Sequence, residues 1–311
     1  MLTKIASSKL PIDQFEADLM SACGSFQLES GFRSKDIHGL VHLEHLADLE
    51  IAHVAKDLHS IRRTKKDLAR DEGENFFLII QEEGQAMMSQ HDNSRVLIPG
   101  DMILIDSAYV SEFSFFGRFS RQLSIHLSRE EMLQRFGVHA KGGKFISKTD
   151  HTAIAVAAIL TKAYQVQHNE HQSHYLKEAI FGLIGSILYE QSDYSNGKDI
   201  DAEVGGAQLL ERGMAFINEH FTDPKLTCQR VADSLGVSIR HLQRAFSLVG
   251  STPSDYLTTR RLEHACLMLK QRDEQETCFV STIAYKSGFN DISNFNRQFR
   301  KAFNCPPSRY Q

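Results

Sequence analysis

Two short stretches in the last third of the chain place arginine, glutamine and asparagine side chains at helical spacing. In "SIRHLQRAFS" (238–247) and "DISNFNRQFRK" (291–301), apolar residues recur every three or four positions, with polar residues between them. Arginine can donate two hydrogen bonds to guanine, and glutamine or asparagine can pair in a similar bidentate way with adenine. A helix that turns such a face outward has the chemistry to read the edges of base pairs.

The two stretches belong to a repeated unit. The segment "VADSLGVSIRHLQRAF" (231–246) aligns with "IAYKSGFNDISNFNRQF" (283–299) when one residue is inserted. A small alanine and a glycine correspond in the two copies, namely Ala232 with Ala284 and Gly236 with Gly288. Glycine tolerates the positive φ of a tight turn, and two helices joined by such a turn make a helix-turn-helix. Any surface helix has a polar face, but the duplication favours a DNA-contacting one.

The polar face defines candidate DNA-binding residues. On a helical wheel, Ile239, Leu242 and Phe246 fall on one side of the first copy, and Phe295 and Phe299 do so in the second. The side chains that point away from these core positions are Arg240, Gln243, Arg244 and Ser247, then Ser293, Arg297 and Arg300. Lys301 is suited to a phosphate contact.

The charge distribution agrees with a localised nucleic-acid site. The chain has 311 residues and a net charge of −4, which by itself gives no indication of DNA binding. Residues 207–311, however, hold 14 Lys and Arg against 10 Asp and Glu, whereas residues 1–206 hold 21 against 29. The net charges are therefore +4 and −8, and the basic part coincides with the repeat.

The texture of the sequence predicts an α+β protein of two domains. Short runs such as "NFFLIIQ" (75–81), "RVLIPGDMILID" (95–106) and "RQLSIHL" (121–127) indicate a small β-barrel or sandwich, and 38–54 reads as strand too. Two helices follow within 150–192, and a polar, glycine-rich stretch comes next. We expect domains over 1–195 and 207–311, joined by a linker over 196–206. Helices are expected over 207–221, 228–235, 239–248, 253–270, 280–287 and 291–302, with a last turn from 307.

Several classes of protein are disfavoured. The five cysteines are odd in number and form no CxxC pair, which argues against a disulfide framework or a zinc ribbon. The N-terminus lacks the apolar region of a signal peptide. The longest uncharged apolar run, "AIFGLIGSILY" (179–189), is too short to span a bilayer. We therefore expect a cytoplasmic protein without a membrane segment.

The C-terminal third resembles the AraC/XylS family of transcriptional regulators. The segments that carry the resemblance are "LTCQRVADSLGVSIRHLQRAF", "RRLEHACLML" and "IAYKSGFNDISNFNRQFRKAFNCPPSRY". It implies two helix-turn-helix modules joined by a linker helix, here about 253–271. The base-contacting positions of the family fall on Arg240, Gln243, Arg244, Ser293, Asn294 and Arg297. Two departures are Arg230, where an acidic residue is usual, and Phe279, where the family often has Ser or Thr.

The N-terminal half resembles the cupin-like effector domain of one branch of this family. The segments "CGSF" (23–26), "PGDMILIDSA" (99–108) and "SRQLSIHLSREEML" (120–133) are most like the regulator of phenylethylamine and tyramine catabolism. The resemblance implies a sensor of a small molecule, such as an aromatic amine, aldehyde or acid. Candidate effector contacts are Tyr109, Phe113, Phe115, Arg118 and Arg121, for which core packing and surface ion pairs are the alternative roles.

These features predict a DNA-binding transcription regulator, by family habit an activator of a catabolic operon. The expected partners are double-stranded DNA, a small effector, RNA polymerase and a second copy of the chain. Gly182 and Gly185 let two helices approach, either at a dimer seam, as in relatives, or in packing within the domain. The alternative is a cupin-type enzyme fused to a DNA-binding module. Such an enzyme needs clustered metal ligands, and the sequence has no HxH motif followed by Glu. We expect no metal, no cofactor and no enzymatic activity.

Overall fold

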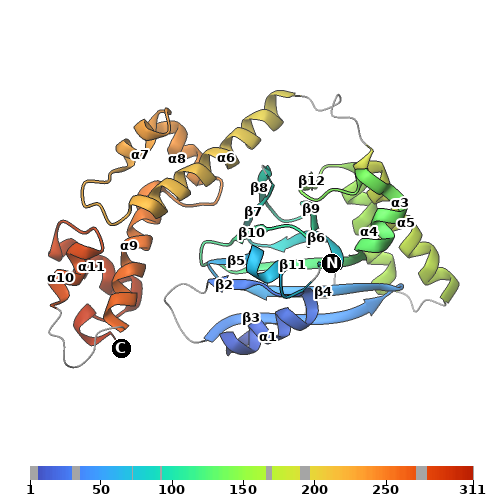
Figure 1. The fold of residues 1–311 in the computed structure, drawn as a ribbon, viewed down its shortest axis with the longest axis horizontal. Coiled ribbons are helices and arrows are strands. Elements are labelled where there is room, and N and C mark those ends of the chain that lie inside the picture. The colour runs from blue at the N-terminus through green and yellow to red at the C-terminus, as the bar shows by residue number, and fades with distance from the viewer. Residues whose placement is uncertain are drawn as a thin grey trace. The chain divides into compact units, whose positions relative to one another are not determined.

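The computed structural model describes residues 6–29, 36–71, 73–91, 93–165, 170–189, 197–270 and 279–310. Its contacts divide the chain into two compact units, with the division after Ile200. The first unit holds the strands together with α1 (Ile12–Cys23), α2 (Lys65–Leu68), α3 (Arg129–Phe136), η1 (Gly137–His139), α4 (His151–Gln165) and α5 (Glu170–Leu188) (Figure 1). The regular elements of the second unit are all helices within its described residues.

The strands of the first unit form two sheets. The larger has the spatial order β1 (Ser8–Pro11), β3 (Asp36–Leu46), β4 (Leu49–Lys56), β11 (Ser120–Ser128), β6 (Asn75–Glu83), β9 (Met102–Asp106) and β12 (Lys144–Ile146). The smaller has the order β2 (Gln27–Glu29), β5 (Ser60–Arg63), β10 (Ser111–Ser114), β7 (Ala86–Gln90) and β8 (Asn93–Leu97). Pairings between neighbouring strands are antiparallel.

The expected barrel is corrected to this two-sheet arrangement. Among the described strands, no ladder joins the edges of the large sheet, β1 and β12, to the edges of the small one. Barrels and sandwiches both alternate inward-facing and outward-facing residues along each strand. The sequence pattern therefore does not distinguish the two. The run 38–54 is likewise not one strand but the hairpin of β3 and β4, which turns at Ala47 and Asp48, both with positive φ.

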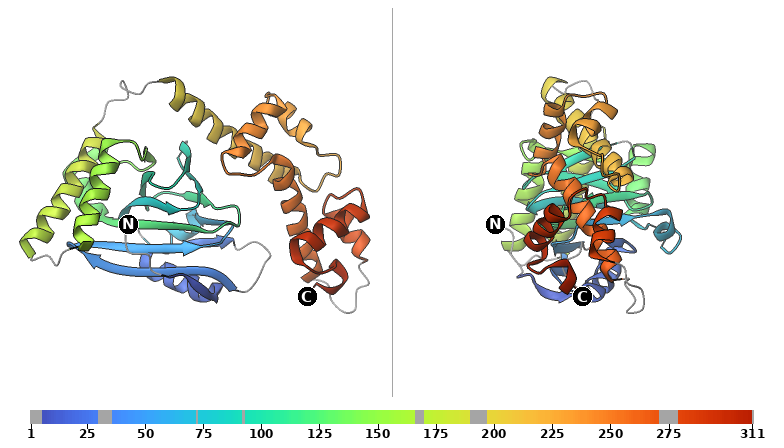
Figure 2. Two further views of the ribbon diagram at one scale, coloured as in Figure 1. Left: turned by 180° about the vertical axis from the view of Figure 1, so that it is seen from behind. Right: turned by 90° about the vertical axis from the view of Figure 1, so that its left-hand side faces the viewer.

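The two faces of the large sheet belong to different cores. Along β6, Phe76 and Leu78 pack in a cluster with α3, α4 and α5, whereas Phe77 and Ile79 pack between the sheets. This is the period of two expected of a strand buried on both faces. Figure 2 shows the green helices beside the large sheet. The inner face of β11 differs, because it carries the polar residues Gln122, Ser124 and His126.

The second unit contains six α-helices and a final 3₁₀ turn among its described residues. They are α6 (Gly197–His220), α7 (Cys228–Ser234), α8 (Ile239–Ser247), α9 (Pro253–Lys270), α10 (Val280–Lys286), α11 (Ile292–Phe303) and η3 (Pro307–Arg309). These follow the expected helices to within two residues except at the start of α6. None of the helices in the described ranges has the length and apolarity that a bilayer span requires.

The expected linker over 196–206 is helical from Gly197 onward. Gly205 and Gly206 indicated a break, because glycine costs about 1 kcal/mol in a helix interior. A side chain at Gly206 would meet Leu248 at 3.1 Å, so the glycine lets α6 approach that residue closely. Tertiary packing has overridden propensity here. Residue 196 lies outside the described residues.

Candidate nucleic-acid interface and interior cavity

The two helix-turn-helix copies have the same backbone hydrogen bonds at their turns. In the first copy, the amide of Gly236 donates to the Asp233 carbonyl (3.1 Å) and that of Val237 to Ala232 (3.0 Å). The corresponding bonds of the second copy are Gly288 to Tyr285 (3.0 Å) and Phe289 to Ala284 (3.0 Å). The expected positive φ at both glycines is confirmed, at 69° and 86°. The repeat seen in the sequence is thus a repeat of backbone geometry.

Each second helix is held by an apolar stripe. In α8, Leu242 and Phe246 are fully buried, and both lie close to Gly213 of α6. In α11, Phe295 and Phe299 are fully buried in a cluster of aromatic rings whose centroids lie 4.4–5.5 Å apart. Such packing fixes the rotation of each helix and so decides which side chains face outward.

Three of the four short helices begin with a side-chain cap. Thr227, Ser238 and Asp291 each accept a hydrogen bond from a backbone amide of the following turn. At Arg230, which replaces the usual acidic residue, the guanidinium pairs instead with Asp223 at 2.6 Å. Phe279 precedes α10 without any side-chain cap and is 68% exposed. The departure at Arg230 is thus compensated locally, but that at Phe279 is not.

The candidate DNA-binding residues chosen from the helical wheel lie on the exposed face. Asn294, which was chosen from the family resemblance, differs from them in its exposure. The exposed candidates are Arg240, Gln243, Arg244, Ser247, Ser293, Arg297, Arg300 and Lys301. Asn294 is only half-exposed, and its Oδ1 accepts a hydrogen bond from Nη2 of Arg297 at 3.0 Å. In this structure Asn294 is therefore paired with a neighbouring arginine of the same helix.

A hollow on the face of α11 is lined by most of the DNA-binding candidates of the second helix-turn-helix copy. It is lined by Ser293, Asn296, Arg297, Arg300 and Lys301. Three of these side chains are cationic, so the hollow has the charge and the donors for phosphate or for guanine. Asn296 was not among the candidates. A helical wheel could have predicted this position, because Asn296 lies three positions after Ser293 and four before Arg300 and so shares their face of the helix.

Helix α9 connects the two modules of this unit. Its first turn is capped by Thr252, whose hydroxyl accepts a hydrogen bond from the amide of Asp255 at 3.1 Å. Arg261 of α9 donates to the carbonyls of Phe221 and Asp223, both at 2.8 Å, and so holds the loop that follows α6. With 18 residues, α9 is about 27 Å long.

The first unit contains a small cavity between its sheets, of about 50 Å³ for the centre of a water-sized sphere. Its lining is mostly apolar and comes from α1, both sheets and the segment after α1: Leu19, Cys23, Phe26, Val54, Lys56, Ile61, Phe77, Ile79, Ile105, Phe113, Phe115, Gln122 and Ser124. Phe113 and Phe115, two of the effector candidates, lie in this lining with their rings parallel and 6.2 Å apart.

The other three effector candidates lie outside the cavity lining. Tyr109 is 47% exposed and packs against the ring of His91 at 4.7 Å. Arg118 is exposed in the turn after β10. Arg121 is buried, and its Nε lies 3.8 Å from a carboxylate oxygen of Glu83. The aromatic and cationic candidates are therefore not brought together, because Arg121 lies one position before the inward-facing Gln122 on a strand of period two.

Sequence reasoning missed the cation that does reach the cavity. Lys56 is fully buried, and its Nζ donates to Oε1 of Gln122 at 2.5 Å and lies 4.3 Å from the ring centre of Phe115. The amide of Gln122 donates in turn to Gln81 at 2.9 Å. Burial lowers the pKa of Lys56 to about 7 and raises the pKa of the nearby Cys23 thiol to about 12. The sequence feature that could have indicated a polar site in the cavity is the presence of Gln122 and Ser124 in an otherwise largely apolar strand.

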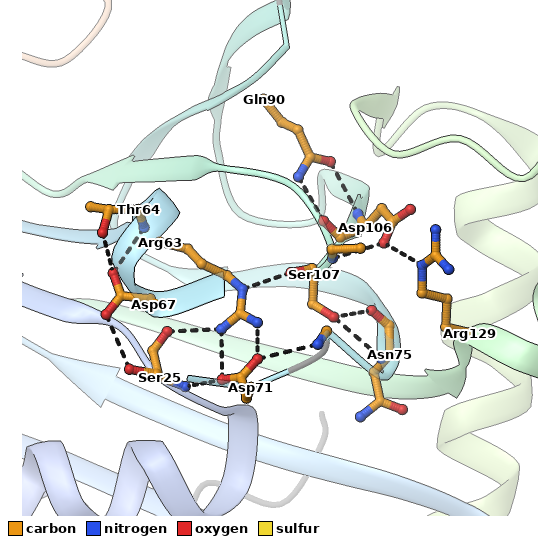
Figure 3. Close-up of polar contacts among 12 residues, drawn as sticks. Ser25, Arg63, Thr64, Asp67, Asp71, Asn75, Gln90, Asp106, Ser107 and Arg129 are labelled. Carbon is orange, nitrogen blue, oxygen red and sulfur yellow. Dashed lines mark hydrogen bonds and ion pairs between the residues drawn. The ribbon is translucent and has the colours of Figure 1, made fainter. Parts of the chain in front are cut away.

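A buried arginine fixes one wall of the cavity. Arg63 pairs with the carboxylate of Asp71 and donates to the carbonyls of Ser25 (2.8 Å) and Ser107 (2.6 Å) (Figure 3). The amide of Ser25 donates to Asp71 at 2.7 Å, and its hydroxyl donates to Asp67 at 3.0 Å. Ser25 stands between the lining residues Cys23 and Phe26, so these bonds hold that segment in place.

Metal ligation finds no support in this geometry. Among the residues that the structure describes, no three His, Cys, Asp or Glu side chains are grouped to hold a metal ion. His42 and His53 are neighbours, with ring centres 6.3 Å apart, but the Nε2 of His53 binds Glu44 (2.7 Å) and the hydroxyl of Tyr164 (3.0 Å). These side chains tie α4 to the large sheet.

Comparisons with known proteins agree with the local geometry. Residues 231–311 match the family model described as "Helix-turn-helix domain". The chain is 22% identical over 271 residues to the transcriptional activator NphR of Rhodococcus sp., covering 85% of this chain and 78% of that protein. It is 31% identical over 155 residues to the HTH-type transcriptional activator RhaS of Enterobacter sp. (strain 638), covering 49% of this chain and only 51% of that protein. The C-terminal unit thus carries a helix-turn-helix domain, a class of DNA-binding module.

Solved structures give weaker overall matches. The AraC-like transcriptional activator CuxR superimposes with a TM-score of 0.47 at 15% identity, covering 91% of this chain and 100% of that one. The C-terminal domain of AraT, a response regulator from Geobacillus stearothermophilus, gives 0.30 at 28% identity over 33% of this chain and 82% of that one. Matches at these scores carry no argument about function, which the residues themselves have to supply.

Proposed function

We propose that the protein is a sequence-specific DNA-binding transcription regulator of the AraC/XylS type, controlled by a small molecule that binds the first unit. One observation carries this proposal above the others. Two helix-turn-helix copies with equal turn geometry each expose a face of arginine and amide side chains. Two such faces in one chain can contact base edges at two neighbouring sites along the DNA.

The dimensions of the C-terminal unit support two-site reading. The modules are joined by α9, which is about 27 Å long. One turn of B-DNA is about 34 Å, so two recognition helices separated in this way can reach successive major grooves. Arg240, Gln243 and Arg244 would contact base edges from α8, and Ser293, Asn296 and Arg297 from α11. Arg300 and Lys301 would contact phosphate.

The finer assignments rest on resemblance. The relatives NphR and RhaS are named transcriptional activators, so we place this protein as an activator that contacts RNA polymerase and works as a homodimer in the cytoplasm. The likeness of the N-terminal segments to the regulator of phenylethylamine and tyramine catabolism supports a catabolic operon. An aromatic amine, its aldehyde or its acid would then be the effector.

Selection of binding sites from a random DNA pool by the full-length protein tests the central proposal. We expect enrichment of two short motifs whose centres lie about 10 base pairs apart. Affinity for the enriched site should fall steeply as salt rises, because contacts to phosphate release counterions. Enrichment of no motif, or equal affinity for the enriched and a scrambled site, would contradict sequence-specific binding.

A further inference from the structure

Lys56 stands out among the buried cations of the first unit. It is 0% exposed and faces a cavity that is otherwise mostly apolar. The other fully buried cation, Arg63, has the carboxylate of Asp71 as a counter-charge. Within the described residues, the recorded contacts of the Lys56 amine are the neutral amide of Gln122 and the ring of Phe115. A buried charge without a counter-charge is costly.

The groups that surround this amine do not supply an anion. On β11, Gln122 and Ser124 are neutral, and Phe115, directly after β10, is apolar. On α1, Cys23 is a titratable neighbour of Lys56. Burial raises the pKa of its thiol to about 12, so the thiol stays protonated and carries no negative charge. His126 lies 3.9 Å from the sulfur of Cys23, and burial lowers its pKa, which keeps the ring neutral. The cavity therefore has a latent positive site and no internal negative one.

We propose that this cavity binds a small carboxylate with an apolar body, whose carboxylate accepts hydrogen bonds from Lys56. The inference rests on the proposed role of the first unit as a sensor and names the chemical class of its effector. A carboxylate supplies the missing counter-charge, and the aromatic and aliphatic lining takes up the apolar body. An alkylammonium ligand would place a second cation beside Lys56. Between amine and acid, the geometry thus selects the acid.

The size of the cavity limits the apolar body. A cavity of about 150 Å³ takes up benzene in another protein, whereas this one measures about 50 Å³. A branched short-chain acid therefore fits with less rearrangement than an aromatic one. An aromatic acid requires movement of lining residues. Of these, Cys23 at the end of α1 and Phe26 shortly after it are only partly buried.

Binding of the acid should take up a proton. Burial lowers the pKa of Lys56 to about 7, so at pH 8 most of the free protein has a neutral amine here. A bound carboxylate favours the ammonium form and raises that pKa. We expect uptake of about one proton per ligand at pH 8, falling as the pH is lowered below 7. A ligand that binds elsewhere on the surface would not show this uptake.

Calorimetric titration of the full-length protein without DNA provides the test. The probes are isovalerate and phenylacetate, each with its primary amide and with the amine of matching skeleton, isoamylamine or phenylethylamine. Titration at pH 8 in two buffers of different ionisation enthalpy gives the proton uptake. We expect at least one acid to bind at least tenfold more tightly than its amide and amine, with proton uptake. Equal or tighter binding of the amine would overturn the proposal, as would no binding of either acid.

Three variants locate the site. Lys56→Met keeps the length of the side chain but removes its charge, and acid binding should fall at least tenfold. Gln122→Glu gives Lys56 an internal counter-charge, so it should weaken acid binding as well, and it serves if Lys56→Met fails to fold. Lys162→Met, at an exposed lysine of α4, is the matched control and should bind like the parent. Unchanged acid binding in folded Lys56→Met or Gln122→Glu protein would overturn the proposal.

The same titrations separate this inference from the proposed function. Ligand binding is measured on protein alone, whereas the role in transcription depends on the selected DNA site. Acid binding without specific DNA binding would leave the cavity assignment intact and remove the regulator. Specific DNA binding by a protein that binds neither acid would leave the proposed regulator intact and remove the cavity assignment.

Discussion

At the scale of single residues, the exposed arginines of α8 and α11 are expected to act as base readers. Arg244→Ala should weaken binding to the selected DNA site by about 1–3 kcal/mol and relax the preference at one base pair. Arg297→Ala should do so in the other motif. Affinities for the selected site and for single-base variants, measured by fluorescence anisotropy, give both quantities.

The control for these variants is Arg212→Ala, which removes an exposed arginine of α6 outside both recognition faces. It should change affinity for all DNA sequences alike, and only slightly. If Arg244→Ala behaved in the same way, with no change in base preference, Arg244 would be a phosphate contact and not a base reader.

A second residue-scale prediction concerns Lys56 and stability. Its pKa falls from the ordinary value of 10.5 to about 7 on folding, so between these values the unfolded chain binds more protons than the folded one. This group therefore destabilises the fold fully below about pH 7, and the penalty disappears as pH rises toward 10. Lys56→Met should raise the free energy of unfolding by ~4 kcal/mol at pH 7.

Urea unfolding at pH 7 and pH 9.5 checks this sign. The advantage of Lys56→Met over the parent should be clearly smaller at pH 9.5, where the parent lysine is neutral in the folded state. A constant advantage at both values would show that better packing, rather than the charge, explains the effect. Lys162→Met should be indistinguishable from the parent at either pH.

These residues also show how far the sequence could predict the site. The arginine faces followed from a helical wheel, because periodicity and burial agree within a single helix. Lys56 did not, because a polar residue at the end of a strand usually faces solvent. Only the pairing of β4 with β11 places it beside Gln122, and that pairing joins residues 66 positions apart in the chain.

At the scale of elements, the two turn glycines make a matched pair. Both have positive φ, but a Cβ at Gly236 would meet no atom within 4 Å, whereas one at Gly288 would lie 2.3 Å from the carbonyl oxygen of Phe221. Gly236→Ala should therefore cost only the strain of its backbone, about 1–2 kcal/mol. Gly288→Ala should cost clearly more, since backbone must move as well.

Urea unfolding of the two variants, followed by circular dichroism, compares these costs within the helical unit. Equal losses of stability would show that the loop around Phe221 yields easily and that the close approach has no structural role. DNA affinity should follow the same order, because the turn sets the direction of each recognition helix.

The uncapped start of α10 offers a stabilising change. Phe279 is 68% exposed and gives no side-chain cap, whereas Ser at an N-cap position accepts a hydrogen bond from the first turn. Phe279→Ser should raise the free energy of unfolding by about 1 kcal/mol. Phe279→Ala, which removes the ring without providing a cap, is the control, and a similar gain in both variants would assign the effect to the lost exposed ring.

The elements that the sequence predicted best are those with strong local signals. Helices α7 to α11 have a clear period, and all of them except α10 begin with a side-chain cap. Their predicted bounds agree with the structure to within one residue. The short strands β5, β7 and β10 were not predicted, since four or five residues carry little periodicity and depend on their neighbours. Helix α1 was not predicted either.

At the scale of the whole molecule, the division into two compact units predicts two unfolding transitions. Lys56→Met should move only the transition of the strand-containing unit, and Gly288→Ala only that of the helical unit. Hydrogen exchange read by mass spectrometry along a urea series assigns each peptide to a transition. A single transition that both variants shift together would show that the units unfold as one.

The two faces of the large sheet have a consequence for changing the ligand preference of this protein. Along β6 and β9, the cavity-lining Phe77, Ile79 and Ile105 alternate with side chains that pack against the helices. A mutant library confined to lining positions would leave that second core untouched. The same alternation lets natural variants acquire new chemical preferences while the helix-bearing face keeps its sequence, so altered responsiveness and retained folding can evolve independently.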